Sequence, residues 1–161
     1  MNTAAPPQTV NSYVIIHRLE ALTWGSSGPN IGEITATTLT DSPGTVTARI
    51  RAGQGQTQMV IYGIPSTQTL YMGRLYGNMN KAGQAALCDV SVKYNPEPQT
   101  ELTGFLTKHT FGLQSTGTSA LTINYATPKK FAGPGILKMQ VLSGTNDVDI
   151  SGGFDAVLID N

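Results

Sequence analysis

Apolar and polar residues alternate along several stretches of the chain, and this alternation predicts β-strands. It is clearest in residues 45–51, TVTARIR, where Val46, Ala48 and Ile50 share one face and threonine or arginine occupies the other. A period of two is the pattern of a strand with one buried face. Residues 86–94, ALCDVSVKY, alternate in the same way. Further strands are predicted at residues 13–19, 33–38, 57–64, 68–80, 102–111, 120–126, 135–143 and 154–160.

Helices are not expected. Residues 68–80 carry apolar side chains at spacings that fit either element, but Gly73 and Gly77 disfavour a helix and favour a strand with a bulge at a glycine. Residues 80–87 have room for one helical turn at most. About ten strands, at roughly the 8–12-residue spacing of sandwiches and barrels, predict an all-β fold. Its expected architecture is a two-sheet, jelly-roll-like β-sandwich.

Polar and proline-rich stretches set the boundaries of the fold. Residues 1–11, MNTAAPPQTVN, have no periodicity, and Pro6 and Pro7 favour polyproline II. We therefore expect a flexible or extended N-terminal arm, followed by a single sandwich domain at residues 12–161. Turns or loops are predicted at residues 24–32, 41–44, 53–56, 95–99, 112–118, 127–135 and 144–153.

Charge is scarce and balanced. Only 12 % of the 161 residues are charged, and ten Lys and Arg offset ten Asp and Glu. A nucleic-acid partner is not expected, because displacing counterions from phosphates needs a surplus of cations. The hydrophobic share, 39 %, argues against a disordered chain. A neutral surface is easier to keep in solution if an assembly covers much of it.

The sequence carries no sign of export or of a membrane partner. Residues 1–10 lack the basic and apolar regions of a signal peptide, and the apolar runs are far shorter than the ~20 residues that span a bilayer. The single cysteine, Cys88, excludes an internal disulfide and a zinc site built from several cysteines. We expect synthesis in a reducing compartment.

Motifs for enzyme chemistry are missing from the sequence. It contains no GxSxG elbow, no phosphate-binding GxxxxGK[ST] loop and no GxGxxG. Cys88 alternates with valines and is expected to be buried and unreactive. His17 and His109 are expected in structural or surface positions. Residues 146–149, NDVD, could offer oxygen ligands to Ca²⁺, although capping of a turn is favoured. No catalytic, cofactor or metal residue is assigned, and we expect a protein that is not an enzyme.

Candidate interface residues come from strands, from one loop and from the arm. Arg49, Arg51 and Arg74 lie on predicted strands, where a guanidinium can pair with the carboxylate of a neighbouring subunit. Trp24 opens a loop rich in Gly and Ser. The strand tyrosines are expected mostly in the core or in cross-strand pairs. The arm contributes Pro6, Pro7 and Val10.

Three stretches of the chain resemble small virion structural proteins of bacteriophages. They are residues 56–65, QTQMVIYGIP, residues 108–119, KHTFGLQSTGTS, and residues 146–155, NDVDISGGFD, with Leu158 and Asp160 after them. The resemblance implies a place in a virus particle, either in the head or in the tail. It carries over no functional residue.

Composition, missing motifs and resemblance together predict a non-enzymatic virion protein, made in the cytoplasm of a bacterial host. The favoured role is a head decoration or cement protein that binds the capsid shell. Its partners would be the major capsid protein or other virion proteins, and its copies would form a homo-oligomer, with a trimer favoured. The alternative is a receptor- or glycan-binding module of a head or tail fibre. A small polysaccharide lyase or hydrolase is the third hypothesis.

Overall fold

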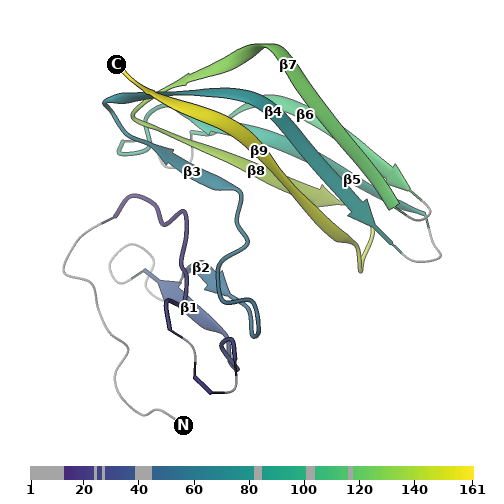
Figure 1. The fold of residues 1–161 in the computed structure, drawn as a ribbon. Coiled ribbons are helices and arrows are strands. Elements are labelled where there is room, and N and C mark those ends of the chain that lie inside the picture. Colours follow the sequence, from purple (N-terminus) through teal and green to yellow (C-terminus); the bar gives the residue numbers. More distant parts are fainter. Residues whose placement is uncertain are drawn as a thin grey trace.

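The computed structural model describes residues 13–23, 25–26, 28–38, 45–81, 85–100, 104–115 and 118–161. These residues form strands and no helix (Figure 1), which confirms the all-β prediction. The strands are β1 (Ile34–Thr37), β2 (Val46–Ile50), β3 (Ile61–Ile64), β4 (Gln68–Asn80), β5 (Ala86–Asn95), β6 (Leu106–Ser115), β7 (Thr118–Ala132), β8 (Gly135–Ser143) and β9 (Asp149–Asp160).

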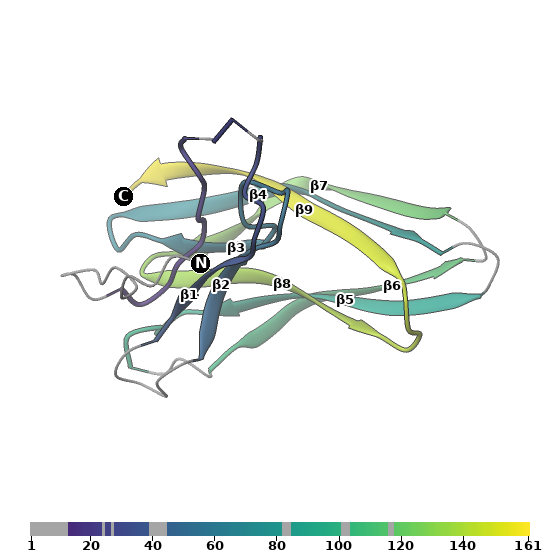
Figure 2. The same cartoon turned by 90° about the horizontal axis from the view of Figure 1, so that it is seen from below.

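Seven strands form two antiparallel sheets that face each other in two layers (Figure 2). One sheet has the order β3-β8-β5-β6 and the other has the order β7-β4-β9. From β3 onward, the chain changes sheet at every step except between β5 and β6, which pair directly. The fold is therefore a β-sandwich-like arrangement in which long-range pairings dominate.

The core lies between these two sheets. Leu75 and Met79 of β4, Val92 of β5 and Leu137 of β8 are fully buried. The aromatic ring of Phe131, from β7, joins the same cluster. Inward residues alternate with exposed ones along β4 and β5, so the period of two in the sequence corresponds to the real inner face.

A bulge interrupts β4 at a glycine, as predicted. The pairing of β4 shifts register between Met72 and Arg74 on both of its sides, toward β7 and toward β9. Gly73 lies at the shift, where a residue without Cβ accommodates the local irregularity.

Strands β1 and β2 pair only with each other among the described residues and lie apart from the larger sheets (Figure 1). Ala48 and Ile50 of β2 are buried, as the alternation predicts. Val46 is 53 % exposed, because it lies at the strand end, beyond the bulge near Thr37. A single sandwich domain at residues 12–161 stays a prediction.

One strand prediction is wrong, and two begin several residues before the observed strand. The strand predicted at residues 102–111 is β6, which begins at Leu106. Residues 13–19 form no strand, although Ile15 and Ile16 are half-buried. The predicted strand at residues 57–64 is regular only in β3, from Ile61 onward. Thr57 instead bonds to the segment around Leu19.

Three strands continue into residues predicted as turns or loops. β6 runs through Ser115, β7 runs through Ala132, and β9 begins at Asp149. β7 tolerates Pro128 because the residue lies where the register with β4 is interrupted, on a strand that pairs with β4 alone among the described residues. Proline and lysine had predicted a loop at residues 127–135, and the structure has a strand there through Ala132.

Candidate functional site

Two of the predicted interface residues line one groove. Arg49 and Arg51 lie on and directly after β2, and their groove has a volume of about 430 Å³. Three glutamines, Gln54, Gln56 and Gln58, also line it. The groove therefore presents guanidinium and amide groups, which bind carboxylates and backbone amides of another chain.

The two arginines differ in their pairing. Arg49 Nη1 lies 3.5 Å from the Glu33 carboxylate, and both side chains are half-exposed. Such a surface ion pair contributes only about 0–1 kcal/mol, so Arg49 remains able to exchange partners. Arg51 has no ion-pair partner among the described residues. A guanidinium can bind a carboxylate through two hydrogen bonds.

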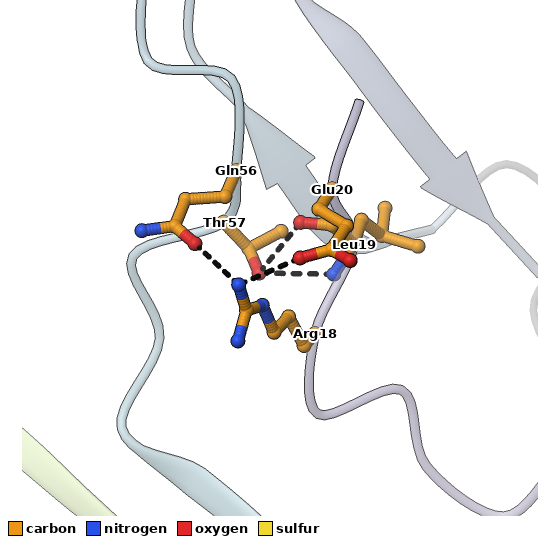
Figure 3. Close-up of polar contacts among 5 residues, drawn as sticks. All are labelled: Arg18, Leu19, Glu20, Gln56 and Thr57. Atoms are coloured by element: carbon orange, nitrogen blue, oxygen red, sulfur yellow. Dashed lines mark hydrogen bonds and ion pairs between the residues drawn. The ribbon is translucent and has the colours of Figure 1, made fainter. Parts of the chain in front are cut away.

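Residues 18–20 contact Gln56, which lines the groove, and its neighbour Thr57 (Figure 3). The Leu19 N–H donates to Thr57 Oγ1 at 3.1 Å, and the Thr57 N–H donates back to the Leu19 carbonyl at 2.9 Å. Arg18 donates to Gln56 Oε1 at 2.9 Å and pairs with Glu20 at 2.6 Å. These contacts join segments about forty residues apart in the chain and hold Gln56 in place.

Asn30 ties a loop to the turn after β2, and sequence analysis did not single it out. Its side-chain amide donates to the Gly32 carbonyl at 2.7 Å and to the Arg51 carbonyl at 3.0 Å. Its Oδ1 accepts the Gly55 N–H at 2.9 Å. Gly53 and Gly55 have positive φ, so this turn needs glycine. The only sequence signal was an asparagine within a Gly, Ser and Pro loop.

Arg74 lies elsewhere. It sits on the outer face of the β7-β4-β9 sheet, where it forms an ion pair with Asp155 of β9. Its guanidinium is 5.8 Å from the ring centre of Tyr76. The structure does not bring Arg74 together with Arg49 and Arg51, so the three do not form one site.

Four other predicted interface residues lie outside the described residues. They are Pro6, Pro7, Val10 and Trp24. Their roles stay predictions, as does the arm at residues 1–11.

The two histidines lie against aromatic rings. The His17 ring centre is 5.2 Å from that of Tyr62. His109 lies 6.1 Å from Phe111 and 6.0 Å from Tyr125. Both imidazoles therefore contribute ring packing. No group of three or more His, Cys, Asp or Glu side chains that could hold a metal ion occurs in the described ranges.

The loop before β9 already holds a cation of the protein. The Lys81 ammonium donates to the carbonyls of Asn146 and Asp147. Asp147 has φ of 55°, a conformation that aspartate tolerates in turns. Ca²⁺ binding here would have to displace Lys81 from these carbonyl oxygens.

Cys88 is buried in β5 with 4 % exposure. Burial raises the pKa of its thiol; the Asp89 charge adds to the rise, and a hydrogen bond with the Leu113 backbone opposes it. The thiol therefore stays protonated to higher pH than a free cysteine. A protonated, buried thiol is a poor nucleophile.

Native Cys88 is expected to react with a thiol reagent on the order of 100-fold more slowly than in denaturant, because labelling needs a local opening of about 3 kcal/mol. The measurement is the labelling rate at pH 7 and pH 9. A Thr122→Cys variant, exposed on β7, is the fast-reacting control. Equal rates for Cys88 and the control would contradict burial as the protecting factor.

Several large apolar side chains remain exposed. Leu22 and Ile31 are more than 80 % exposed, Leu142 of β8 is 73 % exposed and Val157 of β9 is 63 % exposed. Leu142 and Leu87 border a hollow of about 460 Å³ on the outer face of the four-stranded sheet. These positions lie on different sides of the fold, so more than one surface offers apolar contact.

Within the described residues, no helix is long and apolar enough to cross a membrane. No protein-family model matches this chain, and neither does a curated protein or a solved structure.

Proposed function

We propose that this chain is a non-enzymatic structural protein of a bacteriophage virion, a head decoration protein that binds the capsid shell. The carrying observation is apolar exposure on several surfaces, at Leu22, Ile31, Leu142 and Val157, in a chain with few charges. Apolar exposure indicates a contact surface where such side chains gather, as Leu87 and Leu142 do beside one hollow of the four-stranded sheet. Apolar exposure together with low charge favours a protein whose surfaces are covered by partners.

The outer face of the four-stranded sheet is the favoured surface for the shell. Gly112 of β6 lies opposite Asp89 of β5, which lies opposite Leu142 of β8, and the missing side chain at Gly112 leaves the face hollow beside Asp89. Asp89 is the charged residue of this hollow. A shallow apolar hollow with one carboxylate fits an apolar side chain and a neighbouring donor from a shell subunit.

We also propose that the two sheets are a jelly roll without its first strand. An eight-stranded jelly roll has sheets with the orders 1-8-3-6 and 2-7-4-5. If β3 is taken as strand 2, the sheet β3-β8-β5-β6 has the order 2-7-4-5 and the sheet β7-β4-β9 has the order 6-3-8. The vacant first position then lies beside β9. The partners proposed for such a protein are the major capsid protein and further copies of itself, in a closed trimer.

The test is the protein content of purified particles of the phage that encodes the chain. A decoration protein is expected at a copy number comparable to the shell protein, by gel densitometry. A far lower copy number would favour the fibre module instead, and absence from the particle would overturn the proposal. With the wild type in high copy, Leu142→Asp is expected to lower occupancy at least ~10-fold, since a charge in an apolar contact costs more than about 1.4 kcal/mol.

A further inference from the structure

The outer edge of β9 is open in the part of the chain that the structure describes. β9 pairs with β4 along its whole length, from Asp160 opposite Gln68 to Asp149 opposite Asn80. Among the described residues, no strand pairs with its other side. That side therefore presents a row of backbone N–H and C=O groups to solvent.

The other edge strands carry the devices that discourage pairing. β7 contains Pro128, Lys129 and Lys130, and β3 has only four residues and is followed by Pro65. β6 contains Lys108. β9 has no Pro, Lys or Arg, and residues 156–159 form an apolar run, AVLI. Natural edges are protected by such residues; β9 carries aspartates but no Pro or Lys, so its apolar run at residues 156–159 is the stretch of the edge that is open to pairing.

The core is also open beside β9. A groove of about 680 Å³ lies between the start of β9, at Ile150, and residues 58–61 together with β8. Val141 of β8 is 40 % exposed, although its partner Val90 on β5 is fully buried. An added strand would cover these inner-face side chains and bond to the β9 backbone at the same time.

We propose that the open edge of β9 binds the N-terminal residues 1–12 of a second copy of this chain, as an added antiparallel strand. The described chain begins at Tyr13, which is 62 % exposed, so twelve residues precede a point at the surface. None of these twelve has a charged side chain. Pro6 and Pro7 cannot donate to a strand ladder, which assigns the pairing to residues 8–12, QTVNS, with Val10 opposite the apolar run at residues 156–159 of β9.

The second copy is favoured over the chain's own N-terminus by the direction of the chain. Ile15 Cγ2 lies 3.0 Å from the point that a Cβ on Gly63 would occupy. Gly63 lies near the C-terminal end of β9. The turn that follows β3 contacts this end, because the Thr67 carbonyl accepts a hydrogen bond from the Asn161 N–H. The chain's own residues 1–12 would double back from that end and run parallel to β9. Parallel pairing is less stable than the antiparallel pairing that a second copy allows.

Charge favours the arm over direct pairing of two β9 edges. β9 carries Asp149, Asp155 and Asp160 and no cation. Two antiparallel copies of β9, paired along their length, would bring these carboxylates close together, and like charges on facing strands repel. An arm donated from each copy to the next is a head-to-tail contact, which closes into a ring when the rotation between copies completes a circle. The proposal goes beyond the virion assignment, since it concerns only copies of this chain.

The first experiment measures oligomeric state by native mass spectrometry. The full chain is expected to be oligomeric, and deletion of residues 1–12 is expected to leave folded monomers. Val157→Lys, at a 63 % exposed position on β9, should also give monomers. Thr122→Lys, on the exposed face of β7, is the matched control and should stay oligomeric. A monomeric wild type, an oligomer that survives the deletion, or dissociation by both lysines would overturn the proposal.

The second experiment identifies the donor of the strand. A chain with Val10→Cys and Ala156→Cys, oxidised in its native state, is expected to form disulfides between copies and to run as covalent oligomers. A chain with Val10→Cys and Thr122→Cys is the control and should not. A bond formed within one chain, or equal cross-linking in both variants, would overturn binding by a second copy.

Discussion

Replacing Gly133 with alanine is expected to destabilise the protein by about 3 kcal/mol, as overpacking against rigid atoms does. A Cβ on Gly133 would lie 1.7 Å from the Pro65 carbonyl oxygen and 2.9 Å from the Gln68 carbonyl oxygen. The Gly133 N–H also donates to the Gln68 carbonyl at 2.9 Å. These atoms are backbone, so no side-chain rotation can make room. The β3–β4 and β7–β8 connections would have to separate.

The measurement is thermal unfolding of Gly133→Ala beside Gly73→Ala. No atom lies within 4 Å of a Cβ at Gly73, so that control should change stability by less than ~1 kcal/mol. For a chain of this size, 1 kcal/mol shifts Tm by roughly 2–4 °C, which places the Gly133→Ala shift at about 6–12 °C. Similar shifts for both variants would mean that the loss comes from glycine replacement in general rather than from the close backbone contact.

Alternation predicted the central strand β5 well because its environment is uniform. The predicted residues 86–94 agree with β5, and its buried residues alternate with exposed or half-buried ones, so hydrophobicity reports the face directly. The bounds of β4 and β8 also agree with the predicted residues 68–80 and 135–143, although alternation was not the basis of those two predictions. The bulge at Gly73 was also visible, because glycine inside a long strand marks an irregularity.

Strand pairing, by contrast, cannot be predicted from a local stretch of sequence. Residues 13–19, YVIIHRL, have the composition of a strand, yet a strand also needs a free neighbouring edge. In the structure, Ile15 packs against Gly63, and Leu19 bonds to Thr57. These contacts come from positions about forty residues later in the chain, which a local reading cannot supply.

In the candidate site, too, some features follow from local sequence and others depend on contacts between distant segments. Arg49 and Arg51 are two residues apart, so the period of two is enough to predict that both lie on one face of their strand. Gln56, which also lines the groove, is held by Arg18, and Asn30 bonds to the Arg51 carbonyl; both contacts join segments that are distant in the sequence. Arg74 was grouped with the other arginines by residue type alone, and residue type does not report distance.

Leu75→Ala is expected to destabilise the protein by about 3–5 kcal/mol. Leu75 is fully buried at the centre of β4, with Ile123 of β7 and Phe154 of β9 as cross-strand partners. Truncation removes apolar contacts and leaves a cavity that strands on both sides hold open. Leu142→Ala, at a 73 % exposed position, is the matched control and should cost less than ~0.5 kcal/mol.

Urea unfolding measures the loss of stability, which should be larger for Leu75→Ala than for Leu142→Ala. Binding to particles should be affected in the opposite order. Leu75 acts only through the core, so any Leu75→Ala protein that remains folded should bind particles as the wild type does. Leu142 contributes little to the fold, so its truncation should weaken attachment without weakening the protein. Equal losses of stability would show that the outer face of β8 is part of the folding core, and the shell contact would then have to be assigned to another surface.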